Sequence, residues 1–200
     1  MASIRNVEDR ILDAARACVE AFGVRRTTLT DVARCAGVSR PTVYRRWPDA
    51  TALVADLLTR ELRRILADQG DGPGGPAGED VRARLVRHAG GVARALLAHP
   101  LFVRIVDTEP ELLATYTFQR LGTSHRAALD LVEPVVAEGQ RDGSVRAGDP
   151  AVLARLVLVT VQGTVTSRRL FADVTDESGL VDELAALLDG YLRPPNQESP

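Results

Sequence analysis

The segment SRPTVYRRW, residues 39–47, gathers polar side chains that can contact an anionic surface. Arg40 and Arg45 carry forked guanidinium groups, which bind phosphate oxygens or the acceptor edge of guanine. Thr42 and Tyr44 add hydroxyl groups, which can donate hydrogen bonds to phosphate oxygens. These residue types at this spacing therefore favour contact with a nucleic acid.

A short helix through this segment would turn the polar side chains outward. At about 100° per residue, Val43 and Trp47 share one face, which can pack on a preceding helix. Pro41 and Arg45 then lie on the opposite face, and Pro41 suits the first helical turn, where its missing N–H costs little. Such an outward face fits the major groove of DNA, with Arg40 and Arg45 close to base edges.

A second short helix is predicted directly before this one. Thr28 and Asp31 can cap it, Gly37 ends it, and Ser39 opens the third helix, which runs for about seven residues. Two short helices joined by a turn that contains glycine form a helix-turn-helix signature. The amino end of the second helix also offers the Thr28 hydroxyl and free N–H groups to a phosphate.

The other elements that must position this site are predicted to be helical too, which gives an all-α fold of about nine helices. The first helix opens at a capping box of Asn6 and Asp9, and buries Ile11, Ala15, Cys18 and Phe22. A helix capped by Asp49 runs to about residue 67. The later elements are a helix over 81–98, a short apolar turn at 101–106, a long helix opened by Thr108 and Glu111, a helix that starts at Asp149–Pro150, and a final helix over about 178–192 that buries Leu180, Leu184, Leu187, Leu188 and Tyr191.

The expected domain organisation follows from these elements. The segment DQGDGPGGPAGED is too rich in Gly and Pro for regular structure, so it predicts a flexible loop. The expected parts are a helix-turn-helix domain over 1–48, a connecting helix over 49–67, the loop over 68–80, a ligand-binding and dimerisation domain over 81–193, and a tail over 194–200.

Composition and charge narrow the function classes. Apolar residues make up 45% of the chain and charged residues 26%, which argues against disorder. No apolar run reaches the roughly 18 residues that span a bilayer, and the first ten residues lack a signal-peptide core, so the cytoplasm is expected. Residues 1–60 hold ten Arg against seven acidic residues, a net +3, whereas the remaining 140 residues hold fifteen against twenty, a net −5. Positive charge is thus concentrated in the part that carries the candidate site.

Two cysteines and three histidines suggest no metal or cofactor chemistry. Cys18 and Cys35 are expected to be small buried thiols at core-facing helical positions. The histidines His88, His99 and His125 lack ligand spacing, so neither a metal site nor a cofactor is expected.

The stretch TTLTDVARCAGVSRPTVYRRWPDATALV resembles the DNA-binding signature of the TetR family of bacterial transcription regulators. The resemblance covers about residues 7–58, and two later stretches, HPLFVRIVDTEPELL and GDPAVLARLVLVTVQG, are similar to carboxy-terminal domains in part of the family. It implies an all-helical homodimeric repressor, which leaves a palindromic operator when a small molecule binds the carboxy-terminal domain.

Residue roles follow from the resemblance position by position. It implies that phosphates are contacted by Thr28, Thr42, Tyr44 and Arg46, and that Arg40 with Pro41 faces the bases. Three positions depart from the usual family pattern: Arg46 replaces His, Trp47 replaces Phe, and Ala50 stands where Lys is usual. The first change should strengthen a phosphate contact, whereas the last removes one.

The carboxy-terminal part predicts a dimer interface. Residues 151–161, AVLARLVLVTV, carry one charge in eleven positions, so a helix there must be covered on both sides. One cover can be the chain's own bundle, and the other a second copy that brings the same helix and the final helix to a four-helix interface. The candidate interface residues are Leu153, Leu156, Val157, Thr160, Gly163, Leu184 and Leu188. A central helix buried within one monomer is the alternative.

An effector pocket is expected among the helices of residues 81–170 on the family resemblance. Polar or aromatic residues in apolar surroundings are its candidate lining: Phe102, Asp107, Tyr116, Phe118, Gln119 and Gln162.

Two other function classes stay open at this point. A small helical enzyme would need a nucleophile beside a base, a pair of carboxylates in a pocket or a phosphate loop, and none of GxxxxGK[ST], HExxH and GxSxG occurs. A dimeric helical adaptor that has lost DNA binding gains slight support from Ala50. The sequence favours the DNA-binding regulator over both.

Overall fold

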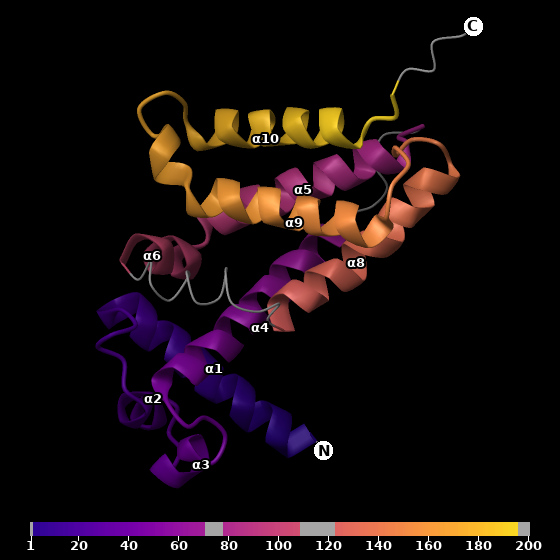
Figure 1. The fold of residues 1–200 in the computed structure, drawn as a ribbon. Coiled ribbons are helices and arrows are strands. Elements are labelled where there is room, and N and C mark those ends of the chain that lie inside the picture. The colour runs from indigo at the N-terminus through magenta and orange to yellow at the C-terminus, as the bar shows by residue number, and fades with distance from the viewer. Residues whose placement is uncertain (1, 71–77, 109–122, 196–200) are drawn as a thin grey trace, which may run out of the picture. The chain divides into compact units, whose positions relative to one another are not determined.

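The computed structural model describes residues 2–70, 78–108 and 123–195. These residues form nine α-helices, one short 3-10 helix and no strand, which confirms the all-α prediction (Figure 1). The chain divides into two compact units, the first drawn from residues 1–62 and 99–121 and the second from residues 63–98 and 122–200.

The first unit is built around the helix-turn-helix. Its helices are α1 (Ala2–Phe22), α2 (Leu29–Cys35), α3 (Arg40–Tyr44), the first part of α4 (Ala50–Gly70) and α6 (Pro100–Thr108). α1 packs against α2 and α6, and α2 packs against α3. Apolar side chains from all five helices meet in one core, among them Ile11, Leu12, Ala15, Val19, Leu29, Val32, Val43, Trp47, Leu53, Leu57, Leu101 and Ile105.

Local signals fix the ends of the two short helices. The Thr28 hydroxyl accepts a hydrogen bond from the Asp31 amide at 3.1 Å, which confirms the predicted cap of α2. Gly37 follows α2 with a φ of +62°, a left-handed conformation that favours glycine. α3 is shorter than predicted: it ends at Tyr44, and the chain continues as a turn in which the Trp47 amide donates to the Val43 carbonyl.

Three predictions for α1 and α2 are wrong. α1 begins at Ala2, so Asn6 and Asp9 lie inside the helix instead of opening it. Phe22, the last residue of α1, is 55% exposed, because the chain turns away at Gly23 before the ring can be covered. Cys35 is also exposed. It lies about 100° around α2 from the buried stripe that ends at Ala36.

A buried carboxylate joins three segments of the first unit. Glu61 of α4 carries a charge but is only 2% exposed, because it lies on the apolar side of its helix. Its carboxylate meets Arg16 of α1 at 3.3 Å, the neighbouring Arg60 at 2.8 Å and His99, just before α6, at 3.7 Å. Burial, followed by the nearby charge of Arg16, holds the pKa of His99 below its usual value. Arg60 continues the network to Asp13 of α1 at 2.8 Å.

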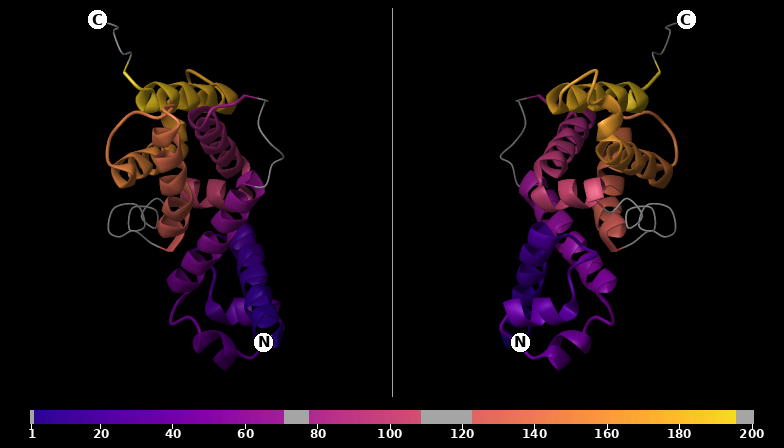
Figure 2. Two further views of the ribbon diagram at one scale, coloured as in Figure 1. Left: turned by 90° about the vertical axis from the view of Figure 1, so that its right-hand side faces the viewer. Right: turned by 90° about the vertical axis from the view of Figure 1, so that its left-hand side faces the viewer.

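The second unit is a helical bundle. Its helices are the end of α4, α5 (Val81–Ala98), α8 (Thr123–Arg141), α9 (Pro150–Thr166), the 3-10 helix η1 (Arg168–Phe171) and α10 (Glu177–Leu192). α5 packs against α8, α9 and α10, and α9 packs against α8 and α10, as the two views of Figure 2 show. Its core includes Leu85, Ala89, Ala93, Leu97, Leu129, Val136, Leu153, Val157, Val161, Val181, Leu184, Leu188 and Leu192.

Several predicted boundaries in this half of the chain hold. α5 covers the predicted range 81–98, and Asp149 caps α9 by accepting a hydrogen bond from the Ala151 amide at 2.9 Å. Pro134 lies inside α8, which continues past it. The first part of the long helix predicted to open at Thr108 and Glu111 falls on residues 109–122, outside the described residues, and its later part coincides with α8; Thr108 itself is the last residue of α6.

Three other expectations are wrong. The apolar turn expected at 101–106 is part of the nine-residue helix α6, which Pro100 opens and which buries Leu101 and Ile105 one turn apart. α4 continues to Gly70, so the start of the expected loop is helical. Leu187 of α10 is 57% exposed, since it lies beside the buried stripe of Leu180, Leu184 and Leu188.

No single helix within the described ranges is long and apolar enough to cross a membrane, although the adjoining α5 and α6 would be so if taken together.

Candidate nucleic-acid interface

α3 is held in place by two buried side chains. Val43 is fully buried, and Trp47, just beyond the helix, is 2% exposed. The Trp47 indole also donates a hydrogen bond from Nε1 to the Asp56 carboxylate of α4 at 2.9 Å. A five-residue helix is unstable alone, so these contacts are what give α3 a defined orientation.

The opposite face of α3 is open to solvent. Arg40, Pro41, Tyr44 and Arg45 are exposed, with the Tyr44 side chain 51% exposed, as the helical wheel predicts. Thr42 is half-buried, and its hydroxyl shares a hydrogen bond of 2.8 Å with the Ser39 hydroxyl. This face thus offers two guanidinium groups and a phenol to a partner.

Two residues with implied phosphate contacts are bound to carboxylates of the same chain. The Arg46 guanidinium donates to the Glu8 carboxylate of α1 at 3.1 Å. The Thr28 hydroxyl, besides capping α2, donates to the Asp31 carboxylate at 2.6 Å. A phosphate would have to exchange with a carboxylate at either position, which makes these contacts weaker candidates than those of Tyr44.

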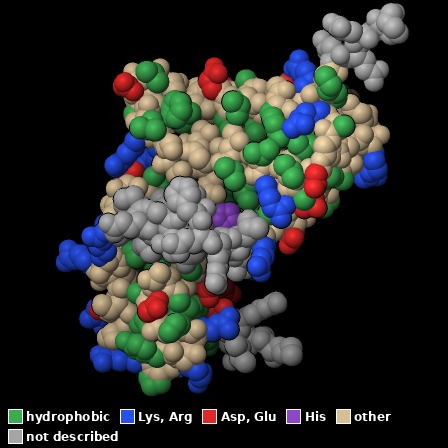
Figure 3. All heavy atoms as spheres, in the orientation of Figure 1, with side chains coloured by type: hydrophobic (Ala, Val, Ile, Leu, Met, Phe, Trp, Pro, Cys, Tyr) green, Lys and Arg blue, Asp and Glu red, His purple; other side chains and the backbone are tan. Residues whose placement is uncertain are grey.

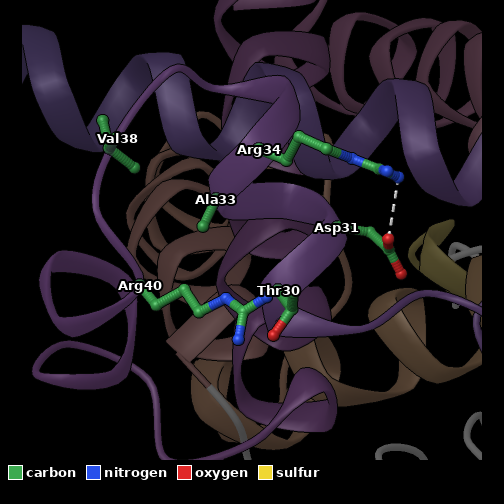
Figure 4. A pocket seen from close by; sticks show the side chains of 6 residues that line it. All are labelled: Thr30, Asp31, Ala33, Arg34, Val38 and Arg40. Carbon is green, nitrogen blue, oxygen red and sulfur yellow. Dashed lines mark hydrogen bonds and ion pairs between the residues drawn. The ribbon is translucent and has the colours of Figure 1, made fainter.

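An open hollow of about 280 Å³ lies between α2 and the start of α3. Its lining is Thr30, Asp31, Ala33, Arg34, Val38 and Arg40 (Figure 4). In that view the Arg40 side chain extends toward Thr30, while Arg34 is paired with Asp31 at 2.9 Å. The Asp31 charge is therefore partly neutralised by its own helix, and Arg40 is free to turn outward by rotation of its long side chain.

The local charge of the helix-turn-helix is strongly positive. Residues 24–49 contain six Arg and two Asp, a net +4 within 26 residues. Arg side chains (blue) lie along the edges of the part of Figure 3 that belongs to the first unit. Such a surface attracts a polyanion before any specific contact is made.

The candidate effector residues that the structure describes belong to both units. Phe102 of α6 is half-buried and packs edge-on against the His99 ring, with centroids 5.2 Å apart. Asp107 is half-buried on the same helix. Gln162 of α9 belongs to the second unit, where its Oε1 lies 3.0 Å from Nε2 of His125 of α8. Tyr116, Phe118 and Gln119 lie outside the described residues. Across the described ranges, no group of three or more His, Cys, Asp or Glu side chains is arranged to hold a metal ion.

The candidate dimer residues divide into two sets. Four of them, Leu153, Val157, Leu184 and Leu188, are buried in the core of the single chain. Leu156 is 43% exposed, Gly163 is exposed and Thr160 is half-buried. Other exposed apolar side chains lie on the same two helices and the segment between them: Val152, Val159, Leu170, Phe171, Val174 and Leu187. Hydrophobic patches over α9 and α10 are visible in Figure 3.

Sequence reasoning missed two features of the first unit. One is the buried Glu61 with its charged partners. The sequence carries a signal for this burial, because Leu53, Leu57, Glu61 and Ile65 recur every four residues and therefore share one helix face. The other is the proximity of Cys18 and Cys35, whose sulfur atoms lie 3.6 Å apart. Their separation of 17 residues across a turn carries no periodic signal.

Comparison with known proteins identifies the family of the amino-terminal unit. Residues 11–57 match the family model described as bacterial regulatory proteins, tetR family. An uncharacterised HTH-type transcriptional regulator of Mycobacterium tuberculosis is 39% identical over 183 residues, which is 92% of this chain and 93% of that protein. The HTH-type transcriptional regulator AqdR of Rhodococcus erythropolis is 43% identical over 58 residues, 28% of either chain.

Solved structures share the fold along most of the chain. The transcriptional repressor QsdR of R. erythropolis, from the TetR family, superposes with a TM-score of 0.68 at 17% identity and covers 96% of this chain and 99% of its own. RolR in complex with resorcinol gives a TM-score of 0.71 at 12% identity, over 96% of this chain and 90% of RolR. The fatty acid degradation regulator FadR of Bacillus halodurans gives 0.67 at 20% identity, over 90% and 93% of the two chains.

Proposed function

Because the chain belongs to the TetR family of bacterial HTH-type transcriptional regulators, we propose that it is a homodimeric repressor of the cytoplasm that binds a palindromic operator through α3. A small-molecule effector would release it from that operator. In this proposal residues 1–48 are the DNA-binding domain, residues 49–67 connect it, and residues 81–193 bind the effector and the second copy.

The observation that carries this proposal is the division of α3 into two faces. Val43 and Trp47 are buried and fix the helix, whereas Arg40, Tyr44 and Arg45 are exposed. A helix held from one side, with guanidinium groups on the other, fits the major groove, where arginine binds the O6 and N7 acceptors of guanine.

The proposed roles separate positioning from base recognition. Arg40 and Arg45 would contact base edges, and Pro41 would allow the backbone to approach them. Tyr44 and Thr42 would hold phosphates through their hydroxyl groups, with Thr28 and Arg46 as outer phosphate contacts (after release from Asp31 and Glu8). Ala50, half-buried at the start of α4, has no polar group with which to add a further contact.

Binding to the DNA that flanks its own gene tests these roles. If the dimer contacts about eight phosphates, the logarithm of the binding constant should fall with the logarithm of salt concentration at a slope near −7. Arg40→Ala should weaken the preferred duplex by about 1–3 kcal/mol and leave unrelated duplexes almost unchanged. Tyr44→Phe should weaken all duplexes alike. Fluorescence anisotropy across a salt series measures all three effects.

A matched control for the arginine change is Arg94→Ala, which removes an exposed guanidinium from α5 of the second unit. Its affinity and salt slope should equal those of the unaltered protein. An Arg40→Ala variant that loses affinity equally on every duplex would contradict the base-contact role. Absence of salt-sensitive binding to any duplex would favour the adaptor function. Titration of the complex with small metabolites then tests release by an effector.

The exposed apolar face of α9 and α10 supports the proposed dimer. Val152, Leu156 and Val159 lie on α9, and Leu187 lies on α10, all between 43% and 60% exposed. Isolated apolar residues are common on surfaces, but Val152, Leu156 and Val159 follow helical spacing and share one face of α9, which packs against α10, and such a stripe is typical of an interface. Gly163, exposed on α9, would let a second backbone approach closely.

A charge placed on this face should dissociate the dimer. Leu156→Arg puts a guanidinium at a position where two copies would meet and is expected to yield monomers at micromolar concentration, because an uncompensated buried charge costs several kcal/mol. Sedimentation equilibrium gives the mass directly. Leu131→Arg on α8, at a position 54% exposed, is the control and should stay dimeric. If both variants keep the mass of the unaltered protein, the proposed face is wrong.

The proposed effector site lies within the second unit. Gln162 and His125, both half-buried, form a polar pair between α9 and α8, in a bundle with an apolar core. A polar pair in apolar surroundings supports a role in orienting a small ligand. Phe102 and Asp107 belong to the first unit and are not part of this proposed site.

A further inference from the structure

The two cysteines of the chain meet inside the helix-turn-helix. Cys18 of α1 and Cys35, the last residue of α2, have their Sγ atoms 3.6 Å apart, and their thiols share a hydrogen bond. Cys18 is 3% exposed, whereas Cys35 is exposed. One thiol of the pair therefore belongs to an exposed residue, and the other lies in contact with it from the core side.

The packing of α1 on α2 keeps this pair together. Ala15 and Val19 of α1 lie in the same core as Leu29 and Val32 of α2. Directly after Cys35, the Ala36 carbonyl accepts a hydrogen bond from the Arg10 guanidinium of α1 at 2.8 Å. The end of α2 is thus tied to α1 next to the thiols, so the two sulfur atoms stay close in the folded chain.

We propose that Cys18 and Cys35 are an oxidisable pair that a hydroperoxide converts into an intrachain disulfide. The Cys35 sulfur attacks the peroxide oxygen, the O–O bond breaks, and Cys35 becomes a sulfenic acid, while the leaving oxygen takes the Cys35 thiol proton and departs as water or an alcohol. The Cys18 sulfur then attacks the Cys35 sulfur and expels hydroxide, which takes the Cys18 proton and leaves as water. Two thiols are oxidised and one peroxide is reduced, with no other reactant.

The order of these two steps follows from the environment of the thiols. Burial, followed by the hydrogen bond to Cys35, raises the pKa of Cys18 to about 11, so this thiol stays protonated near neutral pH. The exposed Cys35 thus meets the oxidant first. Cys18 acts only when a sulfenic acid has formed in contact with it, which protects Cys35 from further oxidation.

The disulfide would alter the geometry of the DNA-binding surface. A sulfur–sulfur bond is about 2.05 Å long, so the Sγ atoms must approach by roughly 1.5 Å. Cys35 is followed by Ala36 and by Gly37, the turn that leads to α3, and a shift at the end of α2 reaches α3 through this turn. This consequence, unlike disulfide formation itself, rests on the proposed function.

Peptide mapping tests the bond. The reduced full-length protein is treated with hydrogen peroxide, digested with trypsin without reduction, and analysed by mass spectrometry. We expect the protein mass to fall by about 2 Da and peptides 17–25 and 35–45 to appear joined, with both changes reversed by dithiothreitol. If Cys35 instead gains oxygen atoms, or joins the Cys35 of another copy, while the unlinked peptide 17–25 persists, the proposal is overturned.

Two variants identify the role of each thiol. Cys35→Ser, at an exposed position, should keep the fold and show no loss of mass under peroxide. Cys18→Ala should keep the reactive thiol but lose its protection, so Cys35 should advance to the sulfinic acid, a gain of about 32 Da. Protection of Cys35 that persists in Cys18→Ala would contradict the pairing.

DNA binding by the oxidised and reduced forms tests the consequence. A displacement of more than about 0.5 Å exceeds what a precise contact surface tolerates, so we expect operator affinity to fall by about tenfold or more on oxidation and to recover on reduction. Equal affinity of both forms would refute the link to DNA binding. If the peptides join but the reduced protein binds no duplex at any salt concentration, the redox site stands and the proposed function fails.

Discussion

Trp47→Ala is expected to lower the free energy of unfolding of the first unit by about 3–5 kcal/mol and to abolish DNA binding. The Trp47 ring is 2% exposed in a core shared with Val43 and Leu53, and its removal leaves a cavity beneath α3. It also breaks the hydrogen bond from Nε1 to Asp56. Denaturant titration followed by far-ultraviolet circular dichroism measures the loss. A variant that unfolds within about 1 kcal/mol of the unaltered protein would show that Trp47 does not anchor α3.

Trp47→Phe separates packing from the hydrogen bond. The smaller ring still fills most of the site, so the expected cost is about 1–2 kcal/mol, part of it from the lost contact to Asp56. DNA binding should persist in this variant. Because Trp47 is the only tryptophan of the chain, its fluorescence in the unaltered protein reports on the first unit alone and distinguishes its unfolding from that of the second unit.

The helix-turn-helix could be predicted because each of its signals is local. A cap at Thr28, a left-handed turn at Gly37 and the i, i+4 pair of Val43 and Trp47 involve neighbours in sequence, and each acts as predicted. The carboxyl end of α3 was predicted too late in the chain, because this boundary depends on how the chain turns to bring Trp47 into the core. Local patterns were therefore sufficient to predict which face of α3 is exposed.

The apolar helices of the second unit show what such patterns leave open. Residues 151–161 are apolar nearly all round, so their periodicity could not distinguish the face that packs in the chain's own core from the face left for a partner. The structure assigns Leu153 and Val157 to the core and leaves Leu156 and Val159 exposed. The same ambiguity placed Leu187 in the core, although its neighbours Leu184 and Leu188 already fill that face.

Contacts between segments far apart in sequence account for the other gaps. The thiols of Cys18 and Cys35 meet only because α1 and α2 pack against each other, and no residue pattern within either helix indicates it. Glu61 is different, because its position in an apolar stripe could be predicted from the sequence. Its partners Arg16 and His99 could not, because they come from elsewhere in the chain. A charged residue on a buried helix face therefore predicts that the charge has partners within the chain, not that the residue is exposed to solvent.

Glu61→Gln is expected to lower the free energy of unfolding of the first unit by about 3 kcal/mol, the lower end of the cost of breaking a buried ion pair. The amide keeps the shape of the side chain but removes the charge that faces Arg16 and Arg60. Both guanidinium groups retain other partners, Glu20 and Asp13, which limits the loss. The same denaturant titration measures it, with Trp47 fluorescence as the local signal.

Glu20→Gln is the matched control, because it removes the other carboxylate bound to Arg16 at a position that is one-third exposed. A solvent-exposed i, i+4 pair contributes only about 0.5 kcal/mol, so the two variants should differ clearly. The Glu61 carboxylate also raises the pKa of His99 against the larger effect of burial, so Glu61→Gln should move that pKa further down in a proton NMR titration. An unchanged His99 titration together with equal stabilities of the two variants would mean that the buried carboxylate does not hold α1, α4 and the start of α6 together.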